Sequence, residues 1–439
     1  MRSEMQAPRW GRKVLVLGAL VLAACGVTAE PPEAEPREED AVFAMRDSGG
    51  GQGPFPTWST PTFAAVPALA TDGQQFLTVW RDSGRPGELY AARVSKHGRL
   101  LDPDGIRLNL EPALKDGDPA VAYDGKQFLV VWQSEFTLNL VRVNRDGTVE
   151  PPVLPIVDTF TSPAPAPTIA CGWRKCLVAW IDFDDPRSVR GVIVETDDSG
   201  LGTRELVISS PAPSLAAFGI SAAWGHDRFL VVWSDERTGS PKVIAARVKA
   251  NGTVLDPAGI PLSDSPGRQT NPDVVTTKHG FLVAWTDTRL GNPDIFATLV
   301  KSNGSVPDAD GFPITTGPET EFLPALAYDG SRVLASWTRF SPERLSVRGN
   351  FVRSDGTLAA PDGFPLSNGE FIREGQSDVA FTDETHFVVY GAAPVVDEPP
   401  FQVILGSRVK KNGSLVDDPA IRISHSPSVE ETAGAPGAR

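Results

Sequence analysis

A short apolar run that ends in an aromatic residue recurs seven times in this chain of 439 residues. Each run closes an 11-residue unit that aligns without gaps, as in AYDGKQFLVVW and AWGHDRFLVVW. The aromatic residues are 52, 48, 53, 52, 52 and 53 positions apart. A nearly fixed period of this length indicates a fold built from copies of one supersecondary unit. The seven residues are Trp80, Trp132, Trp180, Trp233, Trp285, Trp337 and Tyr390.

Each copy predicts four antiparallel strands. The 11-residue unit holds two strands around a turn such as Asp-Gly at 124–125, and a third strand at 243–248 runs into Asn-Gly at 251–252. Asn, Asp and Gly favour such hairpin turns because they tolerate positive φ. A fourth strand expected at 253–263 contains prolines, which restrict it to a sheet edge. The glycine of the second turn recurs as Gly98, Gly147, Gly200, Gly252, Gly304, Gly356 and Gly413.

These units predict an all-β fold, a seven-bladed β-propeller of four-stranded antiparallel blades over residues 63–425. The 41 Gly and 40 Pro agree with many turns and short strands. An open solenoid is the structural alternative, but it needs caps that the flanking sequences do not resemble. We expect the recurring aromatic residue to fill the core between adjacent blades, because every copy carries it at one position.

The first 24 residues are typical of a secretory signal, with basic residues before the apolar run VLVLGALVLAA, which is too short to span a bilayer. The run ends in LAAC, which resembles the lipobox of bacterial lipoproteins. This resemblance implies cleavage before Cys25 and acylation of its thiol. An ordinary secretory signal is the alternative. Gly26 follows the cysteine, so we expect the outer membrane or the cell surface rather than retention at the inner membrane.

The formal net charge is -14, and the predicted signal peptide carries four basic residues and one acidic residue, which leaves -17 for the mature chain. Such a charge argues against nucleic acid or an anionic lipid surface as a partner. Residues 25–62 include EPPEAEPREED and are expected to form a disordered tether. Residues 426–439 are expected to be a disordered tail. We expect a monomer that contacts the membrane only through its lipid anchor.

A WxDxR pattern supplies the main candidate ligand residues. One interpretation is that this pattern grips a polar or sugar ligand at the channel mouth through charge-assisted hydrogen bonds. The structural alternative, which the sequence favours, is that each Asp caps its own turn and pairs with the Arg. The candidate residues are Asp82, Asp182, Asp235, Arg237, Asp287 and Arg289.

Cys171 and Cys176 lie at either end of the turn in ACGWRKCLVAW. Their positions face each other across a hairpin, so an exported protein is expected to join them in a disulfide. No metal or other cofactor is expected, because the five histidines are scattered over different copies and are expected in surface turns. The acidic clusters at 182–185 and 307–311 are better explained by turn chemistry than by calcium.

Catalysis is not expected. Sialidases use propellers, yet their SxDxGxxW boxes are missing here, as are GxSxG and HExxH motifs. Through its WxDxR copies the chain resembles secreted bacterial β-propeller lipoproteins, a group mostly without assigned activity, and its resemblance to sialidase-like propellers is one of architecture.

The leading hypothesis is a non-catalytic binding or scaffold propeller on the cell envelope, with a protein or glycan ligand. The seventh copy has a long loop, and residues 392–400 are its candidate contact region. The alternative is a carbohydrate-binding or glycoside-hydrolysing propeller that uses acids such as Glu135 and Asp184. A purely structural envelope component is a third possibility.

Overall fold

A computed structural model describes residues 66–82, 88–109, 117–134, 137–157, 166–172, 174–183, 188–196, 202–209, 219–237, 239–353, 355–393 and 403–424. They belong to one compact unit, Met45–Arg439. The predicted signal peptide, Cys25, the tether and the tail lie outside the described residues. Within the described part, no helix is long and apolar enough to cross a membrane.

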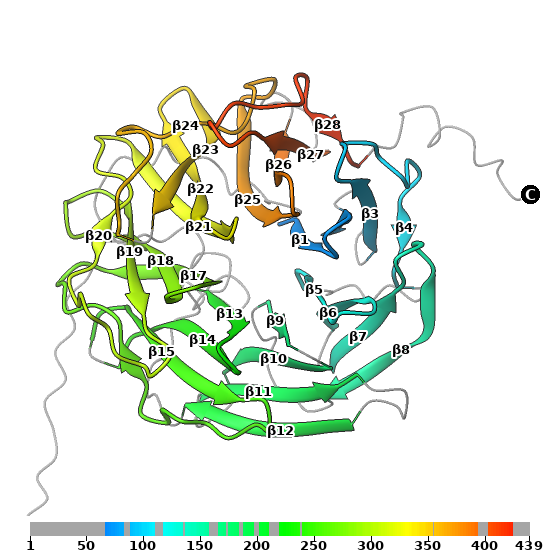
Figure 1. The fold of residues 1–439 in the computed structure, drawn as a ribbon, viewed down its shortest axis with the longest axis horizontal. Helices are drawn as coiled ribbons and strands as arrows, with labels where there is room; N and C mark the ends of the chain where they lie inside the picture. Colours follow the sequence, from blue (N-terminus) through cyan, green and yellow to red (C-terminus); the bar gives the residue numbers. More distant parts are fainter. Residues whose placement is uncertain are drawn as a thin grey trace, which may run out of the picture. The chain divides into compact units, whose positions relative to one another are not determined.

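The described strands form sheets around a common centre, and the first strand of each group of four lies nearest that centre (Figure 1). Each group of four consecutive strands is called a blade here. The first two blades contain β1 (Ala68–Thr71), β2 (Gln75–Arg81), β3 (Leu89–Ser95) and β4 (Ile106–Arg107), then β5 (Ala120–Tyr123), β6 (Phe128–Ser134), β7 (Thr137–Val143) and β8 (Val149–Val157). The next two contain β9 (Thr168–Cys171), β10 (Lys175–Asp182), β11 (Ser188–Glu195) and β12 (Gly202–Ser209), then β13 (Ile220–Gly225), β14 (Arg228–Asp235), β15 (Lys242–Lys249) and β16 (Ile260–Pro261).

A fifth four-stranded sheet and one eight-stranded sheet complete the described strands. The fifth sheet contains β17 (Gln269–Thr277), β18 (Gly280–Asp287), β19 (Asp294–Val300) and β20 (Phe312–Pro313). The eight-stranded sheet contains β21 (Thr320–Tyr328), β22 (Arg332–Ser341), β23 (Arg344–Arg353) and β24 (Phe364–Pro365), then β25 (Arg373–Phe381), β26 (His386–Ala393), β27 (Val403–Val409) and β28 (Ile421–Arg422). A single parallel pair, Leu345 with Arg373, connects its two halves. The prediction of an all-β propeller with four-stranded antiparallel blades is confirmed.

The hydrophobic core lies between neighbouring blades. Each cluster of buried side chains draws on two adjacent blades and contains one of the recurring aromatic residues. One cluster joins the first blade to the last, and within it the rings of Phe76 and Phe387 lie 4.9 Å apart. The inter-blade position expected for the aromatic residues is therefore confirmed.

The outermost strand of the fourth blade is shorter than the sequence predicts. The segment expected as a strand at 253–263 contributes only Ile260–Pro261 to the sheet, plus one isolated pair between Val248 and Val254. Proline offers no backbone donor and therefore weakens a ladder at its position, although β8 continues through Pro155. The turn glycines behave as expected: six of the seven have positive φ, and Gly200 lies outside the described residues.

One histidine departs from the expectation of surface turns. His97, His226 and His279 lie in turns, and His425 lies outside the described residues. His386 instead begins β26, is 1% exposed, and packs its ring 4.6 Å from that of Phe381. Its strand position directs it into the core between blades. Burial lowers the pKa of His386 to about 4, because a charged imidazole is disfavoured there.

Candidate functional site

Two copies of the WxDxR pattern form closed networks around a buried carboxylate. Nε1 of Trp233 donates to Oδ2 of Asp235 (3.1 Å), and Nη2 of Arg237 lies 2.5 Å from the same oxygen. In the blade β17–β20, Nε1 of Trp285 donates to Asp287 at 2.8 Å. The side chains of Asp235 and Asp287 are fully buried. Each carboxylate is therefore already bonded to the indole and guanidinium of its own repeat.

The arginines of this pattern also reach the preceding blade. Nη2 of Arg237 donates to Oγ of Ser209 at 2.9 Å, and Nη2 of Arg289 donates to Oγ of Ser263 at 3.1 Å. Arg289 also donates to the carbonyl of Asp310. The bonds to Ser209 and Ser263 connect the loop after the second strand to the preceding blade, whereas the bond to Asp310 stays within the blade β17–β20.

The remaining two aspartates of the pattern lie in separate blades. Asp182 ends β10 and forms an ion pair with Arg190 of β11, with 2.6 Å between Oδ2 and Nε. Asp82 follows β2, and its backbone N–H donates to the carbonyl of Glu88 at 2.9 Å. The contacts described for Asp182, Asp235 and Asp287 stay within their own blades, which supports the structural alternative. A ligand-binding role for the six residues stays a prediction.

The blade β21–β24 makes the same network with different residues. Arg339 stands where the pattern places Asp, and the carboxylate comes instead from Glu321 on β21. Nε1 of Trp337 donates to Oε1 of Glu321 at 3.3 Å, and Nη2 of Arg339 lies 2.6 Å from that oxygen. Sequence reasoning missed Glu321, although the reversed charge two positions after Trp337 indicates that a carboxylate must come from elsewhere.

A second repeated ion pair also escaped the sequence analysis. In three blades an arginine on the third strand pairs with an aspartate nine positions later. The guanidinium then lies against the turn glycine of the next blade: a Cβ on Gly147 would lie 2.8 Å from Cζ of Arg93. The spacing of nine residues was the available signal. The pairs are Arg93–Asp102, Arg247–Asp256 and Arg408–Asp417, with closest N–O distances of 2.8, 2.7 and 2.7 Å.

Two acids lie among the innermost strands. Asp273 on β17 accepts hydrogen bonds from Oγ of Ser221 on β13 (2.7 Å) and from the backbone N–H of Leu326 on β21 (2.8 Å). Asp378 on β25 accepts the backbone N–H of Leu69 on β1 at 2.8 Å. Both residues are partly exposed as a whole, while their carboxyl groups are desolvated. Each acid therefore bonds its own innermost strand to that of the next blade.

Their environment favours the protonated form. Burial raises the pKa of Asp273 to about 6. Burial and the nearby charge of Asp273 raise the pKa of Asp378 to about 7. Carboxyls with such values change protonation close to neutral pH, and perturbed groups of this kind are frequent at functional sites.

These acids occupy a position that every copy shares. It lies 12 residues before the recurring aromatic, on the first strand of each blade. The copies differ at this position, with small apolar side chains on some blades and polar ones on others. The polar side chains are therefore confined to part of the ring. The residues in chain order are Ala68, Ala120, Thr168, Ser221, Asp273, Ala325 and Asp378.

A third acid with a raised pKa lies on the third strand of its blade. Asp294 begins β19 and is fully buried, and its Oδ2 has no hydrogen-bond partner. Burial and the charge of Glu321 raise the pKa of Asp294 to about 7. The backbone N–H of Glu321 donates to the carbonyl of Pro293 at 2.9 Å, which places the two acids next to each other.

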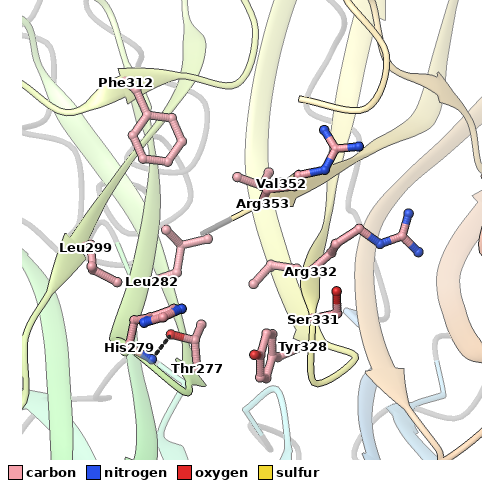
Figure 2. Close-up of a pocket in the computed structure, with 11 residues that line it drawn as sticks. Thr277, His279, Leu282, Leu299, Phe312, Tyr328, Ser331, Arg332, Val352 and Arg353 are labelled. Atoms are coloured by element: carbon pink, nitrogen blue, oxygen red, sulfur yellow. Dashed lines mark hydrogen bonds between the residues drawn. The ribbon is translucent and has the colours of Figure 1, made fainter. Parts of the chain in front are cut away.

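A small cavity lies between the blades β17–β20 and β21–β24 (Figure 2). Its lining includes His279, Tyr328 and Arg332, and its volume is about 20 Å³. A volume of this size holds one or two water molecules. We therefore do not assign a small-molecule ligand to it.

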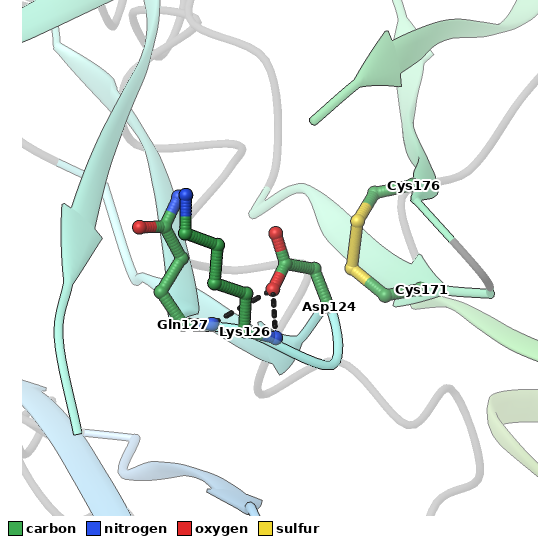
Figure 3. The surroundings of a disulfide bond; sticks show 5 residues. All are labelled: Asp124, Lys126, Gln127, Cys171 and Cys176. Atoms are coloured by element: carbon green, nitrogen blue, oxygen red, sulfur yellow. Dashed lines mark hydrogen bonds between the residues drawn. A yellow bond between two sulfur atoms is a disulfide. The ribbon is translucent and has the colours of Figure 1, made fainter. Parts of the chain in front are cut away.

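The predicted disulfide is confirmed. Cys171 on β9 and Cys176 on β10 are directly opposite in the strand register, with their Cα atoms 4.1 Å apart and their sulfurs bonded (Figure 3). The bond lies near the turn of the preceding blade, where Oδ1 of Asp124 accepts the backbone N–H groups of Lys126 and Gln127. It joins the two ends of one hairpin, which is a structural role.

Other predicted residues are not placed. Cys25, Glu135, Asp184 and residues 394–400 of the seventh-copy loop lie outside the described residues. Among the residues that the structure describes, no group of three or more His, Cys, Asp or Glu side chains could hold a metal ion.

Comparison with known proteins supports the architecture and leaves the chemistry open. No family model and no curated protein sequence matches the chain. The β-propeller domain of the Trilobed protease from Pyrococcus furiosus is similar in structure, with a TM-score of 0.50 and 12% identity over 83% of this chain and 99% of that one. A puromycin-hydrolyzing peptidase of Mycobacterium tuberculosis gives the same score and identity, but this chain spans only 53% of its length. At such identity these similarities show the fold alone.

Proposed function

We propose that this chain is a seven-bladed propeller that binds a ligand without catalysis on the bacterial cell envelope. The count of seven treats the eight-stranded sheet as two blades, β21–β24 and β25–β28. One parallel pair joins these halves, whereas each half has the internal strand order of the other blades. The core clusters support this division, because one of them lies between the two halves.

Display on the envelope rests on the N-terminal sequence. The lipobox-like LAAC and the acidic, proline-rich stretch after Cys25 suggest a lipid anchor followed by a spacer. Labelling cells with a radioactive fatty acid tests this proposal. The wild-type chain should incorporate the label, and a Cys25→Ser variant should not.

One observation carries the binding role: the copies differ in polarity at the repeated position on the innermost strands. The repeated Asp and Arg residues of two WxDxR copies are bonded within the scaffold. Thr168, Ser221, Asp273 and Asp378 break the repeat instead. A partly protonated carboxyl both donates and accepts hydrogen bonds. Such a set suits a ligand rich in hydroxyl groups, and a glycan is therefore the favoured class.

A glycan array probed with the purified full chain tests this role. Bound glycans should be lost in Asp273→Asn and Asp378→Asn variants, which keep an acceptor oxygen for the neighbouring strand. The matched control is Asp104→Asn, which changes an exposed acid in the loop before β4. A wild-type chain that binds no glycan, or acid variants that bind as well as the control, would contradict a glycan site on these strands.

Glycoside hydrolysis is the second candidate, and the raised pKa values of Asp273 and Asp378 favour it. Hydrolysis requires two carboxyls about 5 to 10 Å apart, one of them protonated at the working pH. The charge of Asp273 acts on Asp378 and helps to raise its pKa to about 7, which supports Asp378 as the protonated member of such a pair. Hydrolysis is tested by incubating the chain with the glycans that it binds on the array and measuring the release of reducing sugar. Activity that survives in both Asn variants would remove this candidate.

A further inference from the structure

The hairpin of β22 and β23 carries three arginines on one face. Directly opposite residues of an antiparallel pair project to the same side, and so do alternate residues along a strand. Trp337 is opposite Arg348, Arg339 is opposite Ser346, and Ser341 is opposite Arg344. Apart from the buried Trp337, these side chains keep part of their surface exposed. This face therefore presents partly accessible guanidinium and hydroxyl groups beside an indole. Its residues Arg339, Ser341, Arg344, Ser346 and Arg348 are called the grid here.

One arginine of this grid lacks the carboxylate that the same position has elsewhere. In the blade β9–β12, Arg190 is opposite the recurring Trp180, and Asp182 two positions after that Trp neutralises it at 2.6 Å. Arg348 has the same place opposite Trp337, but the residue two positions after Trp337 is Arg339. The partner carboxylate is thus replaced by a second cation.

Arg348 donates to backbone carbonyls and makes no ion pair among the described residues. Its Nη2 donates to the carbonyls of Asp362 (3.0 Å) and Gly363 (3.3 Å), and its buried Nε has no partner. Burial and the charge of Arg339 lower the pKa of Arg348. The charges of Glu321, Glu319 and Asp362 offset this lowering only in part. A half-buried cation of this kind is costly unless an anion offsets it.

The neighbouring arginines leave donors for a ligand. Arg339 pairs with Glu321, and 20% of its side chain is exposed. Nη2 of Arg344 donates to the carbonyl of Phe371 at 3.0 Å and lies 3.6 Å from Glu374. Its Nε is buried and has no hydrogen-bond partner, so a ligand would be contacted by the outer Nη atoms of the guanidinium. Arginine forks suit planar or tetrahedral oxyanions, to which they donate in pairs.

We propose that Arg339, Arg344 and Arg348 form a binding site for an oxyanion of an external ligand, which takes the place that the carboxylate of Asp182 has beside Arg190. The ligand group is a carboxylate or a sulfate, as in a uronic acid or a sulfated sugar. This site is independent of the acids on the innermost strands. Its failure and the failure of the proposed function are separately observable.

Isothermal titration of the purified full chain with sulfate and with glucuronate tests the site, at constant ionic strength set with chloride. At least one anion should bind saturably, and the one that binds identifies the ligand group. Arg348→Leu should weaken binding about tenfold or more, since a charge-assisted donor pair is lost. Leucine is a suitable replacement because the last blade has a leucine at the equivalent position: Leu405 is opposite the recurring aromatic Tyr390.

The matched control is Arg353→Leu, which removes an exposed charge from the end of the same strand. It should bind the anion as the wild type does. The proposal is overturned if neither anion binds, or if Arg348→Leu and Arg353→Leu bind equally well. Melting temperatures of both variants without anion establish that each is folded.

Discussion

Asp378 accepts the backbone N–H of Leu69 at 2.8 Å, across 309 residues of sequence. Among the described strands, β1–β4 and β25–β28 are each built from consecutive strands. In that part of the chain, the first and last blades meet through side-chain contacts and bonds of this kind. Phe76 with Phe387 supplies the apolar part of that contact, and Lys96 with Glu384 adds an ion pair at 2.7 Å.

Replacing Asp378 by Ala should lower the free energy of unfolding by about 1 to 3 kcal/mol, because a buried backbone donor loses its acceptor. Asp378→Asn keeps an acceptor oxygen and should lose clearly less. Urea unfolding at pH 6 measures both. Equal losses in the two variants would show that the bond to Leu69 is not what Asp378 contributes.

The acids on the innermost strands should make stability depend on pH. The folded pKa values of Asp273 and Asp378, about 6 and about 7, exceed the ordinary value of 3.8 for this side chain. The folded state therefore holds more protons between these limits. Their contribution is complete below about pH 4 and is lost as the pH rises to about 7.

Comparing the wild type with the double variant Asp273→Asn/Asp378→Asn isolates this effect. Asp294 acts in the same direction. His386, whose pKa is lowered, acts in the opposite one, because the unfolded state takes up its proton first as the pH falls. Both residues are unchanged in the variant and cancel in the difference. The free energy of unfolding of the wild type, relative to that of the variant, should decrease from pH 4.5 to pH 7.5. The decrease is at most about 1.4 kcal/mol per pH unit for each proton that the folded state holds in excess. If the stabilities of the wild type and the double variant change with pH in the same way, the raised pKa values of Asp273 and Asp378 are refuted.

Asp287→Ala should destabilise the chain by about 3 kcal/mol, because it leaves Arg289 and the indole of Trp285 without their buried partner. Thermal unfolding with and without the substitution measures the loss. The control Asp104→Ala removes an exposed acid and should change stability by less than about 0.5 kcal/mol. A loss at Asp287 no larger than the control's would mean that this carboxylate is not a scaffold group.

Removing the disulfide should weaken the fold without abolishing it. The double variant Cys171→Ser/Cys176→Ser opens a loop with a sequence separation of only 5 residues. The entropic gain from closing so short a loop is about 2 kcal/mol. The midpoint of urea unfolding should fall while circular dichroism keeps its strand signal. A variant without native strand signal would contradict this modest structural role.

Sequence reasoning placed the local features correctly because their causes are local. The turns at Asp124 and Gly252, the pairing of Cys171 with Cys176 and the burial of Trp285 follow from hairpin geometry and strand periodicity. It failed where a neighbouring blade decides the outcome. His386 follows a turn, yet the blade β21–β24 covers it: the rings of Phe351 and His386 lie 5.4 Å apart.

By itself, the sequence determined the repeated unit, the strands within each copy and the disulfide, since each depends on residues close together in the chain. Only the tertiary structure decided what the charged residues do. Asp378 and Leu69 meet because the first and last blades pack together, and Arg348 lies near a second cation because the strand register brings Arg339 to the same face. Contacts between blades join residues that no period in the sequence relates, so their chemistry becomes visible only once the blades are packed.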